Sequence, residues 1–124
     1  MPDFSFVLLY VENPPASATF YSQLLGCPVI EQSPTFAMLP LRDGGVMLGL
    51  WSRKTVEPRA AGVPGSSEVA FTVDSADAVR ATHADWVKRG LKIAQVPAAM
   101  DFGTTFVALD PDGHRLRVFA PKAA

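Results

Sequence analysis

The sequence predicts an α+β protein that contains two copies of one module, and two observations support this prediction. The order strand, helix and three strands occurs twice along the 124 residues. The segment "FVLLYVEN" aligns with "EVAFTVDS" at an offset of 62 residues, and "RDGGVMLGLW" aligns with "DPDGHRLRVF" at about 68. Antiparallel strands with one crossover helix per half predict a sheet with helices on one face. We expect one domain, with module 1 at about 4–52, a linker at 53–66 and module 2 at about 67–121.

In the first half, local signals place one strand and one helix before three short strands. Residues 5–11 are rich in aromatic and branched side chains, which favour a strand. Asn13 followed by two prolines predicts the start of a helix over about 14–25, and Gly26 predicts its end. Further strands are expected at about 28–32, 35–41 and 46–52, the last two joined by the hairpin turn Arg42-Asp43-Gly44-Gly45.

The second half repeats this order after a linker. Residues 53–66, "RKTVEPRAAGVPGS", are rich in proline, glycine and charge and show no periodicity. The following segment "EVAFTVD" predicts a strand, and Ser75 predicts the start of a helix over about 76–89 that ends at Gly90. Strands are then expected at about 92–98, 103–109 and 114–120.

The alternation of side chains along the strands separates two faces of the expected sheet. In the last strand of module 2, Leu116 and Val118 alternate with Arg115, Arg117 and Phe119. The entirely apolar sets are expected to pack beneath the helices. The other sets mix aromatic, small and charged residues, as the lining of a small-molecule cavity does. The corresponding set in module 1 consists of Met47, Gly49 and Trp51.

Composition and charge argue against several classes of partner. The net charge is −1 with acidic and basic residues interspersed, so we expect no nucleic-acid partner. No apolar run is long enough to span a bilayer, so we expect no membrane partner. Cys27 is the only cysteine, and the first residues lack the features of a signal peptide. We therefore expect a cytoplasmic protein.

The segments "LLYVENPPASATFYSQLLG" and "DPDGHRLRV", together with the repeated module, resemble the vicinal oxygen chelate superfamily of glyoxalases, extradiol dioxygenases and bleomycin-type resistance proteins. The resemblance implies two βαβββ modules whose mixed sheets curl into a cleft, usually completed by dimerisation. It also implies four metal-ligand positions, here Phe6, Gly49, Glu68 and Arg117. Only Glu68 could bind a metal, because phenyl and glycine offer no donor atom and arginine stays protonated. We expect no metal and no other cofactor.

Among the metal-free members, which mostly sequester drugs, the chain resembles phenazine-type antibiotic resistance proteins. This resemblance rests on "YVENPPASATFY", "GLWS" and "FGTTFVALDPDGHRLRV". It implies a homodimer that holds a small planar aromatic ligand between aromatic side chains, without a catalytic group. We expect binding and not catalysis. The alternative is an enzyme of the same fold, either a lyase or isomerase with Glu68 as its base or a glyoxalase- or dioxygenase-like metal enzyme.

Nine residues are expected to contact the ligand. Trp51 offers a ring for stacking. Arg117 and Glu68 form a polar anchor, unless they are a purely structural ion pair. His83 and His114 are expected to be structural. The remaining candidates, for each of which core packing is the alternative, are Tyr10, Phe36, Met47, Phe102, Phe106 and Phe119.

Overall fold

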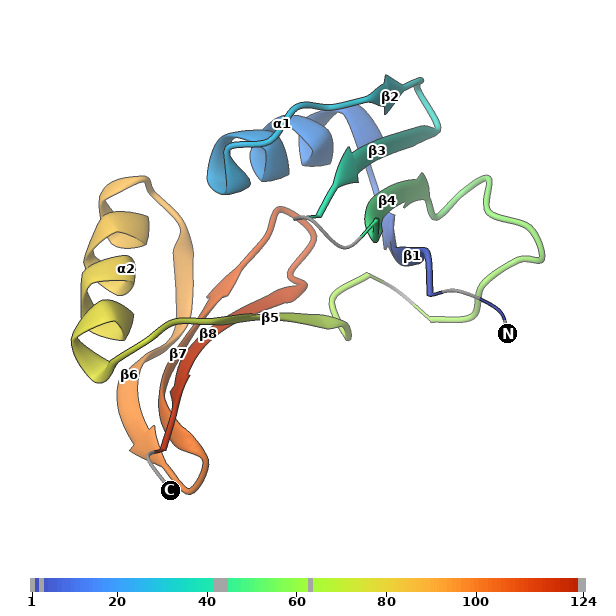
Figure 1. The fold of residues 1–124 in the computed structure, drawn as a ribbon. Helices are drawn as coiled ribbons and strands as arrows, with labels where there is room; N and C mark the ends of the chain where they lie inside the picture. The colour runs from blue at the N-terminus through green and yellow to red at the C-terminus, as the bar shows by residue number, and fades with distance from the viewer. Residues whose placement is uncertain (1, 3, 42–44, 63, 123–124) are drawn as a thin grey trace. The chain divides into compact units, whose positions relative to one another are not determined.

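A computed structural model describes residues 2, 4–41, 45–62 and 64–122 (Figure 1). Its elements follow the predicted order of strand, helix and three strands in each half, which confirms the α+β fold of two βαβββ modules. The chain divides into two compact units, Met1–Pro64 and Gly65–Ala124, which we call module 1 and module 2. Within the described residues, no helix has the length and apolar character needed to cross a membrane.

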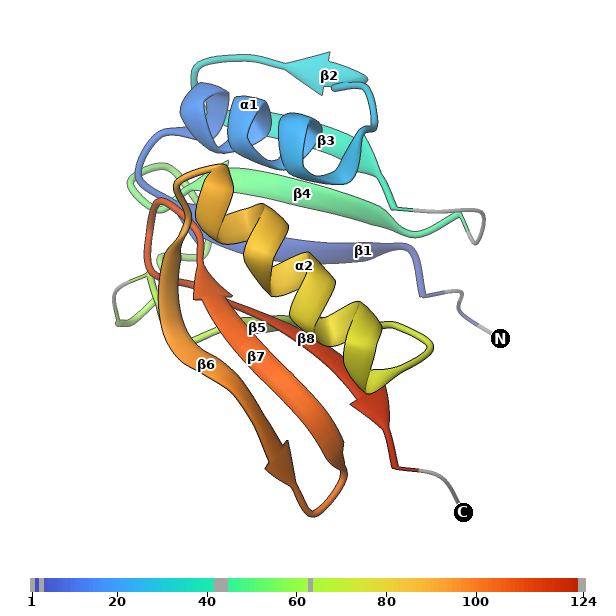
Figure 2. The same ribbon diagram turned by 90° about the vertical axis from the view of Figure 1, so that its left-hand side faces the viewer.

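Module 1 consists of four strands and one helix. β1 (Phe6–Val11) runs parallel to β4 (Met47–Ser52), and β3 (Phe36–Pro40) runs antiparallel to β4. The short strand β2 (Glu31–Gln32) continues the sheet beyond β3, which gives the order β1-β4-β3-β2. Helix α1 (Pro14–Leu25) follows β1 and lies across one face of this sheet (Figure 2).

Module 2 repeats this plan with a longer outer strand. β5 (Glu68–Thr72) runs parallel to β8 (Arg115–Pro121), and β7 (Gly103–Leu109) runs antiparallel to β8. β6 (Lys92–Met100) pairs with β7, and the strand order is β5-β8-β7-β6. Helix α2 (Ala76–Lys88) covers one face of this second sheet (Figure 2). Equivalent elements therefore occupy equivalent places in the two modules.

Both helices begin at the residues that the sequence indicated, and α1 also ends as predicted, whereas α2 ends at Lys88, one residue before the predicted end. The Asn13 side chain accepts a hydrogen bond from the Ala16 amide at 3.1 Å, and prolines occupy the first positions of α1. Gly26 ends this helix in the left-handed conformation, with φ of 67°, which glycine adopts without strain. The Ser75 hydroxyl accepts from the Ala78 amide at 3.0 Å at the start of α2. These local contacts explain why both helix starts were predictable.

The strand bounds differ from the prediction at the outer edges of the sheets. β2 covers only Glu31–Gln32 instead of residues 28–32, and Pro28 has no amide hydrogen to donate to a ladder. β6 continues to Met100, beyond the expected end at 98, because it stays paired with β7 as far as Gly103. The predicted turn Arg42-Asp43-Gly44-Gly45 has its first three residues outside the described part of the chain.

The helix-facing sides of the strands form the cores of the modules. In module 1, Leu48 and Leu50 of β4 are buried together with Tyr21 of α1. In module 2, Leu116 and Val118 of β8 are fully buried. Each such apolar side chain contributes about 1.5–3 kcal/mol when it is removed from water. The apolar alternating sets therefore pack beneath the helices, as predicted.

The outer strand β6 is irregular. Its pairing with β7 shifts register between Ile93 and Gln95 and again between Gln95 and Ala98. Pro97 lies within the second shift and has no amide hydrogen. Such irregularities leave residues unpaired and increase the local twist of the strand.

Candidate functional site: two open sheet faces

Most of the predicted site residues lie on the sheet faces that the helices leave uncovered. Side chains in register on neighbouring strands point to the same side, so the pairing defines each face. We call these surfaces open face 1 and open face 2. Open face 1 consists of Phe6, Leu8, Tyr10, Phe36, Met38, Met47, Gly49 and Trp51. Open face 2 consists of Glu68, Ala70, Thr72, Thr105, Val107, Arg115, Arg117 and Phe119.

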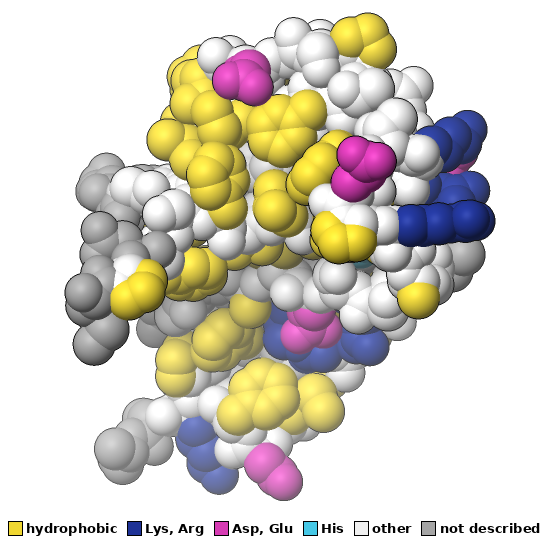
Figure 3. Space-filling view, turned by 90° about the vertical axis from the view of Figure 1, so that its right-hand side faces the viewer, with side chains coloured by type: hydrophobic (Ala, Val, Ile, Leu, Met, Phe, Trp, Pro, Cys, Tyr) yellow, Lys and Arg dark blue, Asp and Glu magenta, His cyan; other side chains and the backbone are white. Residues whose placement is uncertain are grey.

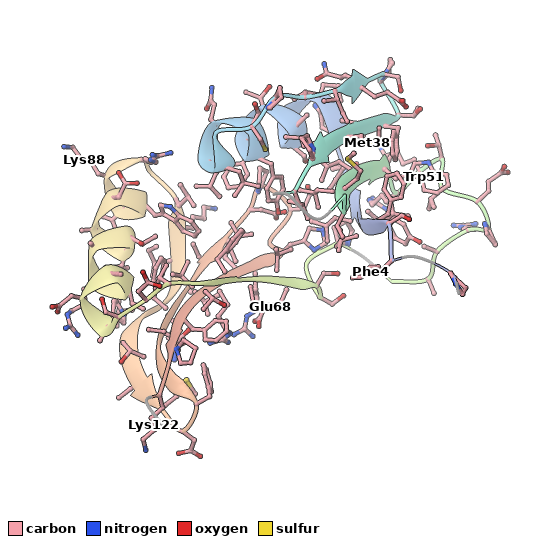
Figure 4. The ribbon with its side chains drawn as sticks, viewed as in Figure 1. Phe4, Met38, Trp51, Glu68, Lys88 and Lys122 are labelled. Atoms are coloured by element: carbon pink, nitrogen blue, oxygen red, sulfur yellow. The ribbon has the colours of Figure 1, made fainter. Side chains whose placement is uncertain are left out.

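Open face 1 is an apolar surface with aromatic rings at one end. Phe6, Leu8 and Tyr10 of β1 are 41%, 42% and 38% exposed. Hydrophobic side chains gather on this side of the molecule in Figure 3. Trp51 of β4 (labelled in Figure 4) pairs with Tyr10 in the parallel register and meets Phe36 edge to face, with ring centroids 6.3 Å apart. Half-exposed rings of this kind can stack on a planar aromatic ligand.

The centre of open face 1 is closed by side chains that meet above Gly49. A Cβ atom at this position would lie 2.3 Å from Cδ2 of Leu8 and 3.3 Å from the Phe36 ring. A larger residue would therefore have to displace Leu8. Met38 (Figure 4) is the cross-strand partner of Gly49, and Met47 lies further along β4. Their flexible thioether side chains can adapt to ligands of different outline.

Open face 2 carries an ion cluster formed by two arginines and one glutamate. Glu68, at the start of β5 (Figure 4), accepts hydrogen bonds from Nε and Nη2 of Arg117 at 2.9 and 3.4 Å. Nε of Arg115 lies 3.3 Å from the second oxygen of the same carboxylate, Oε1. The Arg117 side chain is 17% exposed, whereas that of Arg115 is 49% exposed. One carboxylate faces two guanidinium groups, so the cluster has a net positive charge.

Arg117 is also held by aromatic and hydroxyl side chains. Its Cζ atom lies 5.8 Å from the centre of the Phe102 ring, a cation–π contact. Phe102 belongs to the hairpin turn between β6 and β7 and meets Phe119 edge to face at 6.0 Å. Nη1 of Arg117 donates to Oγ1 of Thr105 at 3.2 Å. The structure thus brings four predicted residues, Glu68, Phe102, Arg117 and Phe119, into one cluster.

Thr105 is a member of this cluster that sequence reasoning missed. Its side chain is fully buried, and its hydroxyl donates to the carbonyl oxygen of Val118 at 2.9 Å. A threonine within a strand is common, so the residue type alone gave no signal. Thr105 shares a face with Arg117 because its cross-strand partner is Phe119, which lies two residues beyond Arg117 in β8. This pairing cannot be read from the sequence of β7 alone.

Phe106 was expected to contact the ligand, and the structure contradicts this expectation. It is fully buried on the helix-facing side of β7, where its cross-strand partner is Val118. Its ring packs edge to face against His83 and Trp86 of α2, at centroid distances of 5.2 and 5.4 Å. Both faces of β7 carry buried residues, so its sequence did not reveal which face Phe106 occupies.

The two histidines lie away from the open faces. His83 packs on Phe106 beneath α2. His114 is buried just before β8, where its Nδ1 accepts a hydrogen bond from the Gly65 amide at 3.3 Å and its amide donates to Asp110 at 2.8 Å. These contacts are structural, as the sequence indicated.

A second group of charges follows β1 and β4 in module 1. Glu12 accepts a hydrogen bond from Nε of Arg53 and pairs with Nζ of Lys54 at 3.0 Å. Hydrogen bonds from Arg53 and then from Lys54 lower the pKa of Glu12 below its usual value of 4.5. All three side chains are well exposed, so solvent screens the attraction.

Comparison with protein families assigns this chain to a known group. The family model described as the glyoxalase/bleomycin resistance protein/dioxygenase superfamily matches residues 4–118. This chain belongs to that superfamily. The resemblance that the sequence motifs indicated is therefore confirmed.

Individual proteins of known structure or function are similar over nearly the whole chain. The phenazine antibiotic resistance protein EhpR of Enterobacter agglomerans is 28% identical over 114 residues, which cover 90% of this chain and 86% of EhpR. A protein of Agrobacterium tumefaciens with a solution NMR structure is 50% identical, with a TM-score of 0.87, and the match covers 99% of this chain and 100% of that one. A glyoxalase/bleomycin resistance protein/dioxygenase from Nocardioides shares the fold, with 24% identity, a TM-score of 0.81 and coverage of 98% and 84%.

The metal-ligand positions implied for this superfamily do not fit a metal ion here. Phe6 and Gly49 offer no donor atom, and Arg117 repels a cation. Glu68 has a suitable carboxylate, but both of its oxygens lie against guanidinium groups. Among the described residues, no three His, Cys, Asp or Glu side chains gather into a potential metal site. A divalent site of this kind needs at least three protein ligands of suitable type.

Proposed function

We propose that this protein is a metal-free binding protein that sequesters a small planar aromatic compound, a phenazine-like antibiotic, and thereby confers resistance. The observation that carries the proposal is open face 1, where Tyr10, Phe36 and Trp51 lie together without being buried. Offset or edge-to-face contact between aromatic rings contributes about 0.5–1.5 kcal/mol beyond the area that it buries. A planar ligand is the class of molecule that such a surface binds best.

The similarity to EhpR supports the same class of ligand. That protein is described as a phenazine antibiotic resistance protein, and the match extends over both modules of this chain. At 28% identity the two need not bind the same compound. We therefore propose only the ligand class, a planar polycyclic aromatic.

The contacts of Glu68 favour binding over catalysis. As the base of a lyase or isomerase, Glu68 would have to take a proton from the substrate through a carboxylate oxygen. Oε2 accepts from Nε of Arg117, while Oε1 accepts from Nη2 of Arg117 and lies near Arg115. A base at this position would first have to give up these partners. Sequestration needs no such step.

Fluorescence can test the proposal because only one of the two tryptophans lies on an open face. Trp86 of α2 is buried against Phe71 and Phe106 of its sheet, and Trp51 lies on open face 1. In a Trp86→Phe variant, Trp51 is the only indole. We expect phenazine to quench its emission in a saturable manner and to be recovered chemically unchanged after incubation. Absence of saturable binding, or conversion of the compound, would overturn the proposal.

Metal analysis tests the metal-free part of the proposal separately. Purified protein dialysed against zinc, nickel or manganese should retain no stoichiometric metal, because the implied ligand positions include Phe6, Gly49 and Arg117. Ligand affinity should be the same before and after treatment with a chelator. Stoichiometric metal that affects affinity would instead favour a metal enzyme.

We further propose that the protein works as a cytoplasmic homodimer in which a second copy covers an open face. Phe6, Leu8 and Tyr10 form an exposed apolar strip that water solvates poorly. Cys27 is a free thiol, as is usual in a reducing compartment. Light scattering should give the mass of two chains. A mass of one chain at all concentrations would exclude the dimer without excluding ligand binding.

A further inference from the structure

The guanidinium group of Arg117 has five N–H donors, and the described residues use three of them. The first edge, formed by Nε and Nη2, faces Glu68 with distances of 2.9 and 3.4 Å. The second edge is formed by Nη1 and Nη2, each of which carries two hydrogens. Nη1 uses one hydrogen on Thr105 and Nη2 uses one on Glu68. Among the described residues, one donor on each nitrogen therefore remains for another partner.

Thr105 is suited to hold Arg117 in this position. The single hydroxyl proton of Thr105 is donated to the backbone carbonyl of Val118 at 2.9 Å. The oxygen can then only accept, and it accepts from Nη1 of Arg117 at 3.2 Å. Because Thr105 is fully buried in the middle of the sheet, its oxygen is a fixed point and not a mobile one. The backbone of β8 thus aims the guanidinium through this hydroxyl.

The Phe102 ring restrains one face of the same guanidinium. The Cζ atom of Arg117 lies 5.8 Å from the ring centre, and Phe102 is supported in turn by Phe119. Glu68 therefore restrains one edge of the guanidinium, Thr105 restrains Nη1, and Phe102 restrains one face of the planar group. A guanidinium held in this way loses little further freedom when it binds a ligand.

We propose that Thr105 is the positioning residue that aims Arg117, so that Nη1 and Nη2 bind the carboxylate of an aromatic acid at open face 2. This inference rests on the proposed function because it concerns the same class of ligand. The net positive charge of the cluster with Arg115 favours an anion. The low exposure of the Arg117 side chain, 17%, means that a bound carboxylate competes with little water.

Arg115 provides the contrast within the same cluster. It has only one contact with Glu68, at 3.3 Å, and its side chain is 49% exposed. No hydroxyl or ring contact restrains it among the described residues. Arg115 contributes charge to the cluster but not a fixed pair of donors, and Arg115→Met is therefore the matched control for the loss of one positive charge.

The experiment compares phenazine-1-carboxylate with its uncharged amide by titration calorimetry. The unaltered protein should bind the acid more tightly than the amide. Thr105→Val keeps the size of the side chain but removes the acceptor, and it should weaken the acid about tenfold while changing the amide by less than about twofold. Thr105→Ser restores the hydroxyl and should restore most of the preference. Arg115→Met should reduce the preference less than Thr105→Val does.

The possible outcomes separate this inference from the proposed function. Equal losses for acid and amide in Thr105→Val would make Thr105 merely structural and overturn the inference. Equal affinity for the two compounds in the unaltered protein would remove the anion site but leave aromatic sequestration intact. Failure of both compounds to bind would overturn both proposals. Urea unfolding of each variant checks the fold, and Thr105→Ala, which also lacks the acceptor, supplies the same comparison if Thr105→Val does not fold.

Discussion

Phe6 in module 1 and Glu68 in module 2 occupy the same place in their sheets, because each pairs with the corresponding residue of the adjacent parallel strand. The same holds for Gly49 and Arg117, two residues beyond those partners. In module 1 this pair of places is apolar, and the side chains of Leu8 and Phe36 close over Gly49. In module 2 it holds a hydrogen-bonded ion pair. One backbone plan therefore supports an apolar, aromatic face in one copy and an ion cluster in the other.

The difference extends to the outer strands. β2 has two residues, whereas β6 has nine and ends in the hairpin that carries Phe102. Because this hairpin reaches the end of β8, Phe102 comes to lie against Arg117 and Phe119. In module 1 the corresponding connection between β2 and β3, residues 33–35, carries no aromatic ring. Phe102 therefore restrains Arg117 on open face 2, and this connection supplies no equivalent ring to open face 1.

The largest effect, on the free energy of unfolding, is expected from a substitution on the helix-facing side of the sheet, where the modules also differ. Phe106 in β7 corresponds to Ala37 in β3, and both are fully buried. Phe106→Ala should lower the free energy of unfolding by about 3–5 kcal/mol because it leaves a cavity beneath α2. Phe102→Ala, which removes a ring that is 44% exposed, should cost clearly less. Urea unfolding measures both, and a smaller loss for Phe106→Ala would contradict its place in the core.

Removal of the charged anchor should affect acidic ligands selectively. Arg117→Met preserves the length of the side chain and removes its donors. Phenazine-1-carboxylate should lose about 1–3 kcal/mol of binding free energy, the range for hydrogen bonds to charged groups, and the amide should lose less. Calorimetry against both compounds measures the difference. Equal losses would identify Arg117 as a structural partner of Glu68 and not as a ligand anchor.

Removal of the stacking ring should weaken acidic and neutral ligands alike. Trp51→Ala should cost either phenazine about 1–3 kcal/mol, the sum of lost stacking and part of the buried area. The control is Trp86→Phe, which changes the buried indole of α2 and should leave affinity unchanged. If the Trp51→Ala protein is folded and binds normally, the ring lies outside the site and open face 1 is not the stacking surface.

The smallest effect, again on the free energy of unfolding, is expected when the charge of Glu12, which follows β1, is removed. Because Arg53 and Lys54 lower the pKa of Glu12, its charged form stabilises the folded state above the ordinary pKa of 4.5. This contribution is lost as the pH falls through the lower pKa of the folded protein. Glu12→Gln should therefore be slightly less stable near neutral pH and equally stable in strong acid. Unfolding measured across this range, at low salt, would contradict the assignment if the difference did not depend on pH.

Local signals made much of the fold predictable. Asn13 and Ser75 accept hydrogen bonds from the first turns of their own helices, so the sequence around them determines both starts. Alternation along β8 separated Leu116 and Val118 from the arginines because one face of that strand is buried and the other is not. The offsets of 62 and 68 residues between the halves agree with the pairing of β1 with β4 and of β5 with β8.

The parts of the candidate site that were missed depend on contacts between distant segments. The face occupied by Phe106 is set by the register of β7 against β8, and β7 carries buried residues on both sides. The role of Thr105 requires Val118 and Arg117, both more than a strand away in the sequence. Neither the face of Phe106 nor the hydrogen bonds of Thr105 can be recognised from the spacing of residues within a single strand. Aromatic character alone therefore identified candidates but could not distinguish open face 2 from the core.

The irregular pairing of β6 bears on how copies of this chain avoid growing into fibrils. An outer strand with regular backbone groups along its free edge can recruit a strand from another molecule, and repetition of that step gives aggregates. β6 interrupts this template at two register shifts and at Pro97, and β2, which occupies the equivalent edge of the other sheet, spans only two residues. Strand addition from another molecule is therefore disfavoured at these two edges.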